Sequence, residues 1–201
     1  YVMVGFDAFT QAINAIGGVE VELTQTEVDY LSQTNFIRKK KYRKGLKVGK
    51  QKLNGYQALG YCRIRKGRDV IGKSVVTANG LTDDYGRTWR QRTVISAVFA
   101  KMKKQPLSKW LDVGNKVLSN IETDLGNNEI ISLMKDTVFL GTADVKQLQI
   151  PMEGYFTTSS DGAYLISTNA SETDWSTNAD ILKKFIFKYN GNGEFKYDDK
   201  K

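Results

Sequence analysis

The feature that most constrains the fold is the stretch from Asp84 to about Lys104, which reads DYGRTWRQRTVISAVFAKMKK. Its apolar residues recur at helical spacing and it stops before Pro106, so we predict one long helix. Asp83 or Asp84 is expected to cap its start. At about 100° per residue, the predicted core-facing side carries five apolar residues. They are Val94, Ile95, Val98, Phe99 and Met102.

Polar side chains share part of this predicted core-facing side. Arg87 and Gln91 fall on it, Arg90 falls at its edge, and Trp89 points outward. An arginine on an apolar stripe is costly to bury unless an anion meets it. The helix therefore predicts a nearby negative charge, from the protein or from a ligand.

Both sources of that charge are consistent with the residues. Asp83 or Asp84 could neutralise one arginine in a local ion pair. Alternatively, a helix start and arginine side chains could bind an exogenous phosphate. Residues 61–64 read as a strand, and alternation would place Arg63 and Arg65 on one face of it. With Arg87 and Arg90 these make four arginines against two aspartates. The residues favour an anion site over simple surface charge and leave both open.

The rest of the chain alternates between short helical and strand patterns. Strands are predicted at 1–6, 19–23, 145–151, 154–160 and 163–168. Helices are predicted at 7–18, 54–60, 108–120, 128–138 and 177–188. Residues 25–50 read as a polar connection, and 189–201 as a polar tail. This alternation predicts an α/β layered domain over residues 1–188.

Composition excludes several kinds of chemistry. The 201 residues contain no histidine and one cysteine, Cys62, which removes histidine-based triads, histidine metal sites and internal disulfides. Cys62 is expected to be a small core residue. The net charge of +8 points to an anionic partner. No run of about 18 apolar residues predicts a membrane span. The chain starts without Met, and we expect a preceding segment with an anchor or export signal.

A basic run, RKKKYRK, occupies residues 38–44. Such lysine-rich runs are commonly solvated loops. The alternative is that the run attracts an anionic polymer or lipid headgroups. The sequence leaves both interpretations open.

Three segments resemble the LytR-CpsA-Psr family of cell-wall enzymes: AINAIGGVEVEL, LNGYQALGYCRIRK and DDYGRTWRQRTVISAV. IPMEGYF and the final helix resemble the end of that domain. The resemblance implies a mixed central β-sheet sandwiched between helical layers. It also implies a phosphotransferase that moves a glycopolymer (wall teichoic acid, capsule or a related polysaccharide) from undecaprenyl pyrophosphate to peptidoglycan. A membrane-anchored, extracytoplasmic location in bacteria is implied as well.

The resemblance also assigns roles to residues. Arg63, Arg65, Arg87 and Gln91 would hold the pyrophosphate, with the three arginines catalytic; Arg90 would be a cation at the rim of the site. Asp84 would cap the helix or support the arginines. The family's Mg²⁺ ligands are expected in a part of the domain that precedes this chain, and loop 66–83 is longer than in many members.

Two other functions are consistent with the charge. One is a non-catalytic module that binds polyprenyl pyrophosphate or an anionic polymer. The other is nucleic-acid binding, but the chain lacks a recognition motif for it, so no nucleic-acid partner is expected.

Overall fold

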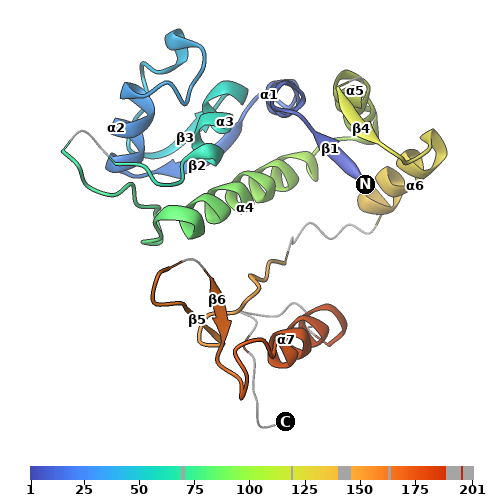
Figure 1. Cartoon of the computed structure of the whole chain (residues 1–201). Helices are drawn as coiled ribbons and strands as arrows, with labels where there is room; N and C mark the ends of the chain where they lie inside the picture. The colour runs from blue at the N-terminus through green and yellow to red at the C-terminus, as the bar shows by residue number, and fades with distance from the viewer. Residues whose placement is uncertain (69–70, 119, 140–145, 163, 189–195, 197–201) are drawn as a thin grey trace. The chain divides into compact units, whose positions relative to one another are not determined.

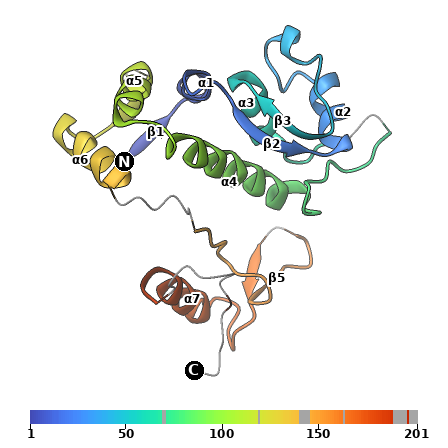
Figure 2. The same cartoon turned by 180° about the vertical axis from the view of Figure 1, so that it is seen from behind.

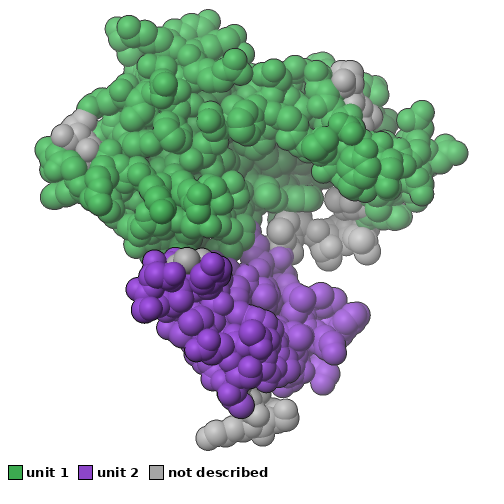
Figure 3. All heavy atoms as spheres, in the orientation of Figure 1, with its two compact units in different colours: residues 1–145 green, residues 146–201 purple. Residues whose placement is uncertain are grey.

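The computed structural model describes residues 1–68, 71–118, 120–139, 146–162, 164–188 and 196. The chain divides into two compact units, residues 1–145 and 146–201 (Figure 3). This division differs from the predicted boundary at residue 188. The predicted tail, apart from residue 196, lies outside the described residues.

The first unit alternates helices and strands, as the sequence pattern predicts. Its elements in chain order are β1 (Val2–Val4), α1 (Phe6–Ala15), β2 (Val19–Leu23), α2 (Gln25–Gln33), the 3₁₀ turn η1 (Lys40–Tyr42), β3 (Gly49–Leu53), α3 (Gly55–Arg63), α4 (Asp83–Met102), α5 (Leu107–Leu118), β4 (Ile121–Thr123) and α6 (Asn127–Phe139). The second unit contains β5 (Phe156–Thr158), β6 (Leu165–Ser167) and α7 (Ser176–Phe187). The α/β class is confirmed.

The described strands pair two by two rather than in one central sheet. β2 pairs with β3, β1 with β4, and β5 with β6, each antiparallel. In β2 the side chains alternate between buried and exposed, which places Val19, Val21 and Leu23 in the core. The single central sheet implied by the resemblance is therefore not formed by the described residues.

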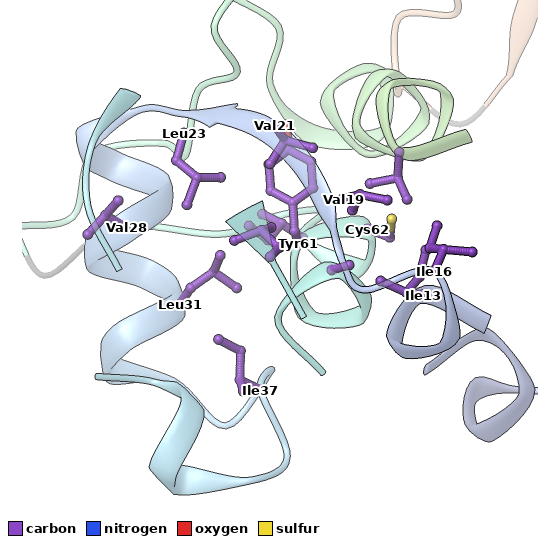
Figure 4. Close-up of a cluster of buried hydrophobic side chains, with 14 of the residues drawn as sticks. Ile13, Ile16, Val19, Val21, Leu23, Val28, Leu31, Ile37, Tyr61 and Cys62 are labelled. Atoms are coloured by element: carbon purple, nitrogen blue, oxygen red, sulfur yellow. The ribbon is translucent and has the colours of Figure 1, made fainter. Parts of the chain in front are cut away.

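The main core lies between β2, α2, α3 and α4 (Figure 4). Tyr61 is fully buried at its centre, and the sulfur of Cys62 lies beside Val19 and Ile16. Burial raises the pKa of the Cys62 thiol to about 12. The prediction that Cys62 is a core residue is confirmed. Helix α4 runs along β2 and α3 in both views of the chain (Figures 1 and 2).

The predicted strand at residues 61–64 is wrong, because α3 continues through Arg63. Its N-cap, Asn54, accepts hydrogen bonds from the backbone of Tyr56 and Gln57, as predicted for a helix start. The following residues of α3, 58–62, are all buried. Periodicity does not distinguish a strand from a buried helix in so short a run.

The structure also contains a helix that the sequence analysis missed. Thr24 and Glu27 form a capping box that starts α2 in the segment read as polar connection. The predicted strand at 145–151 is absent from its described part, 146–151. The predicted hairpin of β5 and β6 and the helices α5, α6 and α7 are present. No helix among the described residues is long and apolar enough to cross a membrane.

The predicted inward face of α4 is rotated relative to the observed one. Val94 and Met102 are buried as predicted, but Ile95 is 48% exposed. Trp89, expected outside, packs against the core, while the fully buried residue of the second turn is Arg90. The core-facing side of α4 was predicted from its apolar residues alone. That method misplaces the buried face because it gives no weight to Arg90, which is buried through its ion pair with Glu27.

Candidate functional site

Two of the predicted arginines share one carboxylate. Arg65 Nε lies 3.2 Å from Asp84 Oδ1, and Arg87 Nη2 lies 2.7 Å from the same oxygen. About half of the Asp84 and Arg65 side chains is exposed, and about a third of Arg87. We refer to Arg65, Asp84 and Arg87 as the arginine–aspartate cluster. Arg65 and Arg87 were expected to lie close together, with either an aspartate or an exogenous anion meeting them; here Asp84 meets both, and Arg65 follows a helix rather than lying on a strand.

The start of α4 places Asp84 and Arg87 in this cluster. Thr82 occupies the N-cap position and makes no side-chain capping bond to the helix, so the predicted cap by Asp83 or Asp84 is wrong. Gly86 allows a close approach here, because a Cβ at this position would lie 3.0 Å from the Leu81 carbonyl oxygen. The Asp84 carboxylate is thereby directed to the two arginines rather than to the helix backbone.

Arg87 retains an unused donor. Its Nε is buried and has no hydrogen-bond partner among the described residues. A buried donor without a partner is unfavourable, and an anion beside it would remove that cost. One helical turn further on, Gln91 is exposed, and its Nε2 donates to the Cys62 carbonyl at 3.4 Å. This differs from the predicted core-facing position of Gln91 and joins α4 to the end of α3.

Arg63 lies apart from the cluster. It is the last residue of α3, and its guanidinium carbon lies 4.9 Å from the ring centre of Phe6 and 5.6 Å from that of Phe36. Such cation–π contacts orient an arginine without neutralising it. Within the described part of the chain Arg63 has no acidic partner.

Arg90 does not lie at a rim, and that prediction is wrong. Its side chain is fully buried, and its Nε donates to Glu27 Oε1 at 2.7 Å. Nη1 and Nη2 donate to the carbonyls of Ile64 and Val75 at 3.3 and 3.5 Å. Arg90 therefore joins α2, the end of α3 and the loop that follows to α4. Ile64, whose carbonyl accepts from Arg90, immediately precedes Arg65, so Arg90 fixes the backbone next to the cluster. Because Arg90 is fully buried, it is not accessible to a ligand.

Glu27, the buried partner of Arg90, was not predicted from the sequence. Burial raises the pKa of its carboxyl, opposed by the hydrogen bond from the Thr24 backbone and by the charge of Arg90. The motif TQTE at residues 24–27 is a signal for a helix start and could have placed Glu27 on a helix. Nothing in the sequence indicates that this glutamate pairs with an arginine 63 positions away.

The charges around the cluster do not cancel. Arg65 and Arg87 carry two positive charges against the single negative charge of Asp84, while Arg90 is neutralised separately by Glu27. The cluster therefore keeps one net positive charge, which suits an anion such as a phosphate group. The described residues contain no group of three acidic or cysteine ligands for a metal. Asp84 is already bound to two arginines, so these residues do not form a Mg²⁺ site.

An apolar cavity of about 230 Å³ lies elsewhere in the first unit. Its walls come from α1, α4, α5 and β4 and are almost entirely apolar. The lining residues are Ala12, Ile13, Ile16, Val98, Met102, Trp110, Val113, Gly114, Val117 and Ile121. A cavity of this kind accepts hydrocarbon.

Comparison with known proteins identifies the family. The profile of the LytR_cpsA_psr family matches residues 1–182. The chain belongs to this family.

The LytR_cpsA_psr relatives include two Bacillus proteins. The chain is 29% identical to the polyisoprenyl-teichoic acid–peptidoglycan teichoic acid transferase TagV of Bacillus subtilis, over 67% of this chain and 30% of that protein. It is 27% identical to the transferase TagU of Bacillus mycoides, over 77% of this chain and 43% of that protein. The chain thus spans less than half the length of these relatives.

Solved structures support the family's fold for this chain. The protein gbs0355 of Streptococcus agalactiae superposes with a TM-score of 0.57 at 27% identity, over 84% of this chain and 51% of that one. Bacillus subtilis TagV gives a TM-score of 0.55 at 24% identity, over 92% and 61%. At 24% identity, the similarity to the TagV structure supports the fold alone.

Proposed function

We propose that the chain is part of a phosphotransferase that attaches an undecaprenyl-pyrophosphate-linked anionic glycopolymer to peptidoglycan. The observation that carries the proposal is the arginine–aspartate cluster, which holds two arginines on one carboxylate and leaves Arg87 Nε buried without a partner. It lies in the segment matched by the family, some of whose members bear the name of such transferases. Wall teichoic acid and capsule polysaccharide are the polymer classes proposed.

The reaction would be a displacement at phosphorus. A hydroxyl of peptidoglycan forms a new P–O bond to the phosphate that carries the polymer, and the phosphoanhydride bond breaks. Polyprenyl phosphate leaves with the bonding electrons, and the hydroxyl proton passes to a base. The role proposed for Arg63, Arg65 and Arg87 is to hold the pyrophosphate and to stabilise the charge that develops on its oxygens. Gln91 would donate a further hydrogen bond.

The apolar cavity would hold part of the polyprenyl chain. Its almost purely apolar wall suits a hydrocarbon and offers nothing to a sugar or phosphate. A lipid carrier also agrees with the proposed extracytoplasmic, membrane-anchored location of the whole protein. Mg²⁺ is proposed as the cofactor of the whole protein.

Two arginine variants test the proposal in the full-length protein. Arg63→Ala and Arg87→Ala are expected to abolish polymer attachment to the wall while the protein still folds, as judged by circular dichroism. Arg68→Ala is the matched control, because this exposed arginine lies in the loop after α3 and donates to the Gly72 carbonyl. Normal attachment in both test variants would contradict the proposal.

A second candidate function is a non-catalytic module that binds polyprenyl pyrophosphate. One observation favours it. Among the described residues, Asp84 is the only carboxylate bonded to the arginines of the cluster. Because it is paired with both of them, it is poorly placed to act as a general base. Tight binding of polyprenyl pyrophosphate by the full-length protein, without release of polyprenyl phosphate when Mg²⁺ and peptidoglycan are added, would establish this alternative.

A further inference from the structure

Residues 38–47 form a dense positive surface, which we call the basic arm. In ten residues it contains seven cations and no acidic residue: Arg38, Lys39, Lys40, Lys41, Arg43, Lys44 and Lys47. The arm is the light-blue loop that connects α2 to β3 at the top of Figure 1, and it includes η1. Arg43 is half-buried. The other six cations, Arg38 and the five lysines, are exposed.

The arm is held in a defined conformation against α3. Arg43 Nε donates to the Ile37 carbonyl at 2.8 Å, and Gln57 Nε2 donates to the Tyr42 carbonyl at 3.0 Å. The rings of Tyr42 and Tyr56 stack with their centres 5.4 Å apart. These contacts hold the middle of the arm, at Tyr42 and Arg43. The cations are therefore presented on a fixed surface rather than on a solvated tail.

The lysines of the arm rest on aromatic rings instead of on carboxylates. Lys39 Nζ lies 4.4 Å from the ring centre of Tyr56, and Lys41 Nζ lies 4.9 Å from that of Tyr42. The hydrogen bond to Tyr56 raises the pKa of Lys39, which keeps it charged. Contact with a ring positions an ammonium group but leaves its charge uncompensated.

Acidic partners are nearly absent. In the part of the chain that the structure describes, Arg38 is the one arm residue in an ion pair, with Asp7 at 3.9 Å and both side chains mostly exposed. The neighbouring strand β3 is different. Its Lys50 and Lys52 stand opposite Glu22 and Glu20 of β2 in the antiparallel register. The lysines of β3 therefore face glutamates across the strand pair, whereas the lysines of the arm have no facing carboxylates among the described residues.

The arm adjoins Arg63. Phe36, one of the two rings beneath Arg63, is two positions before Arg38. Tyr56, beneath Lys39, and Arg63 lie at opposite ends of α3, about 10 Å apart at 1.5 Å per residue. Positive charge therefore lies at both ends of α3, with Lys39 of the arm at its start and Arg63 at its end.

The chemistry of the arm favours a polymer over a membrane surface. Its own apolar side chains, Tyr42 and Leu46, are half-buried and pack against the core, so they do not insert into lipid. Surface binding to a bilayer usually combines cations with exposed apolar groups. A row of lysines without acidic neighbours instead matches a chain that carries one phosphate per repeat.

We infer that the basic arm binds the phosphodiester backbone of the glycopolymer, beyond the pyrophosphate end that the arginines hold. The inference rests on the proposed function for the identity of the polymer. Contact along the arm would orient the polymer while its activated end reacts, and it would favour polyphosphate chains over neutral ones.

Salt-dependent binding of purified poly(glycerol phosphate) teichoic acid to the 201-residue chain tests the inference. The test variant is Lys40→Gln/Lys41→Gln/Lys44→Gln. The control variant is Lys103→Gln/Lys104→Gln/Lys116→Gln, which removes three exposed lysines, two from the connection between α4 and α5 and one from α5. Both variants lower the net charge of +8 by three, to +5. The probe has no lipid carrier, so its binding does not depend on the pyrophosphate site.

Counterion release sets the expected size of the effect. Each phosphate contact on a flexible strand contributes about 0.7 to the slope of log affinity against log salt, so three contacts contribute about 2. The test variant should therefore bind on the order of 100-fold more weakly at 0.1 M salt, with the difference vanishing towards 1 M. The control variant should retain most of the affinity and the slope.

Three results would overturn the inference. The first is an equal loss of affinity in the test and control variants. The second is single-stranded DNA of equal charge binding as tightly as the teichoic acid, with the same dependence on the arm. The third is arm-dependent binding to phosphatidylglycerol vesicles with no binding of the polymer. An Arg87→Ala chain should bind the free polymer normally, so failure of the proposed function is distinguishable from failure of this inference.

Discussion

The buried pair of Glu27 and Arg90 offers the sharpest test of the structural reasoning. Both side chains are fully buried, and Arg90 makes three hydrogen bonds, one of them to Glu27 Oε1 at 2.7 Å. Glu27→Gln keeps the shape of the side chain but leaves the guanidinium without a counter-charge. Removal of one partner from a buried ion pair costs about 3–5 kcal/mol of unfolding free energy. A domain has only about 5–15 kcal/mol in total.

Urea unfolding followed by tryptophan fluorescence measures this loss. Trp89 adjoins Arg90 in the chain and packs against the core, so it reports on this region. With a slope of about 2 kcal/mol per molar urea, the midpoint should fall by about 1.5–2.5 M. The matched control is Glu20→Gln, an exposed carboxylate on β2, which should change the unfolding free energy by less than about 0.5 kcal/mol.

A double variant separates a structural role from ligand binding. Glu27→Leu/Arg90→Met replaces the pair by apolar side chains and should recover most of the stability lost by Glu27→Gln, because neither charge is left unpaired. It should also retain binding of polyprenyl pyrophosphate by the full-length protein. A Glu27→Gln variant within 0.5 kcal/mol of wild type would refute the reasoning.

Three further outcomes follow from close contacts and burial. Gly55→Ala should lower the unfolding free energy by at least about 3 kcal/mol in the same urea assay, because the new Cβ would meet the Thr10 carbonyl oxygen at 2.1 Å. Gly86→Ala should destabilise by about 1–3 kcal/mol, although alanine favours helices, because its Cβ would lie 3.0 Å from the Leu81 carbonyl oxygen; a gain in stability would contradict this. Cys62 should resist iodoacetamide at pH 8 in the folded chain and react in urea. Its raised pKa, about 12, means that the contribution of the thiol to stability is present below pH 9 and is lost as the pH rises towards 12.

Local signals in the sequence predicted many of the helices and the central group of the site. The capping residue Asn54 and the long periodic stretch before Pro106 define α3 and α4 because these features act over a few residues. Charge counting also predicted that Arg65 and Arg87 lie near each other, but it left open whether an aspartate such as Asp84 or an exogenous anion meets them. Excess arginine beside two aspartates is visible without any knowledge of the fold.

Long-range pairing was not predictable in the same way. Glu27 and Arg90 are separated by 63 positions, and either could have been a surface residue by sequence alone. The error at residues 61–64 has a related cause. A helix buried on most sides has no polar face, so nothing in its periodicity distinguishes it from a strand.

The shared oxygen of Asp84 has a consequence for how the site meets its ligand. Two guanidinium groups repel each other, and without a counter-ion they would separate before an anion arrived. Asp84 holds Arg65 and Arg87 together as a built-in placeholder for that anion. In the proposed function, a phosphate ligand would enter a preorganised site and take over part of the carboxylate's role, so that little of its binding energy would be spent on bringing the arginines together.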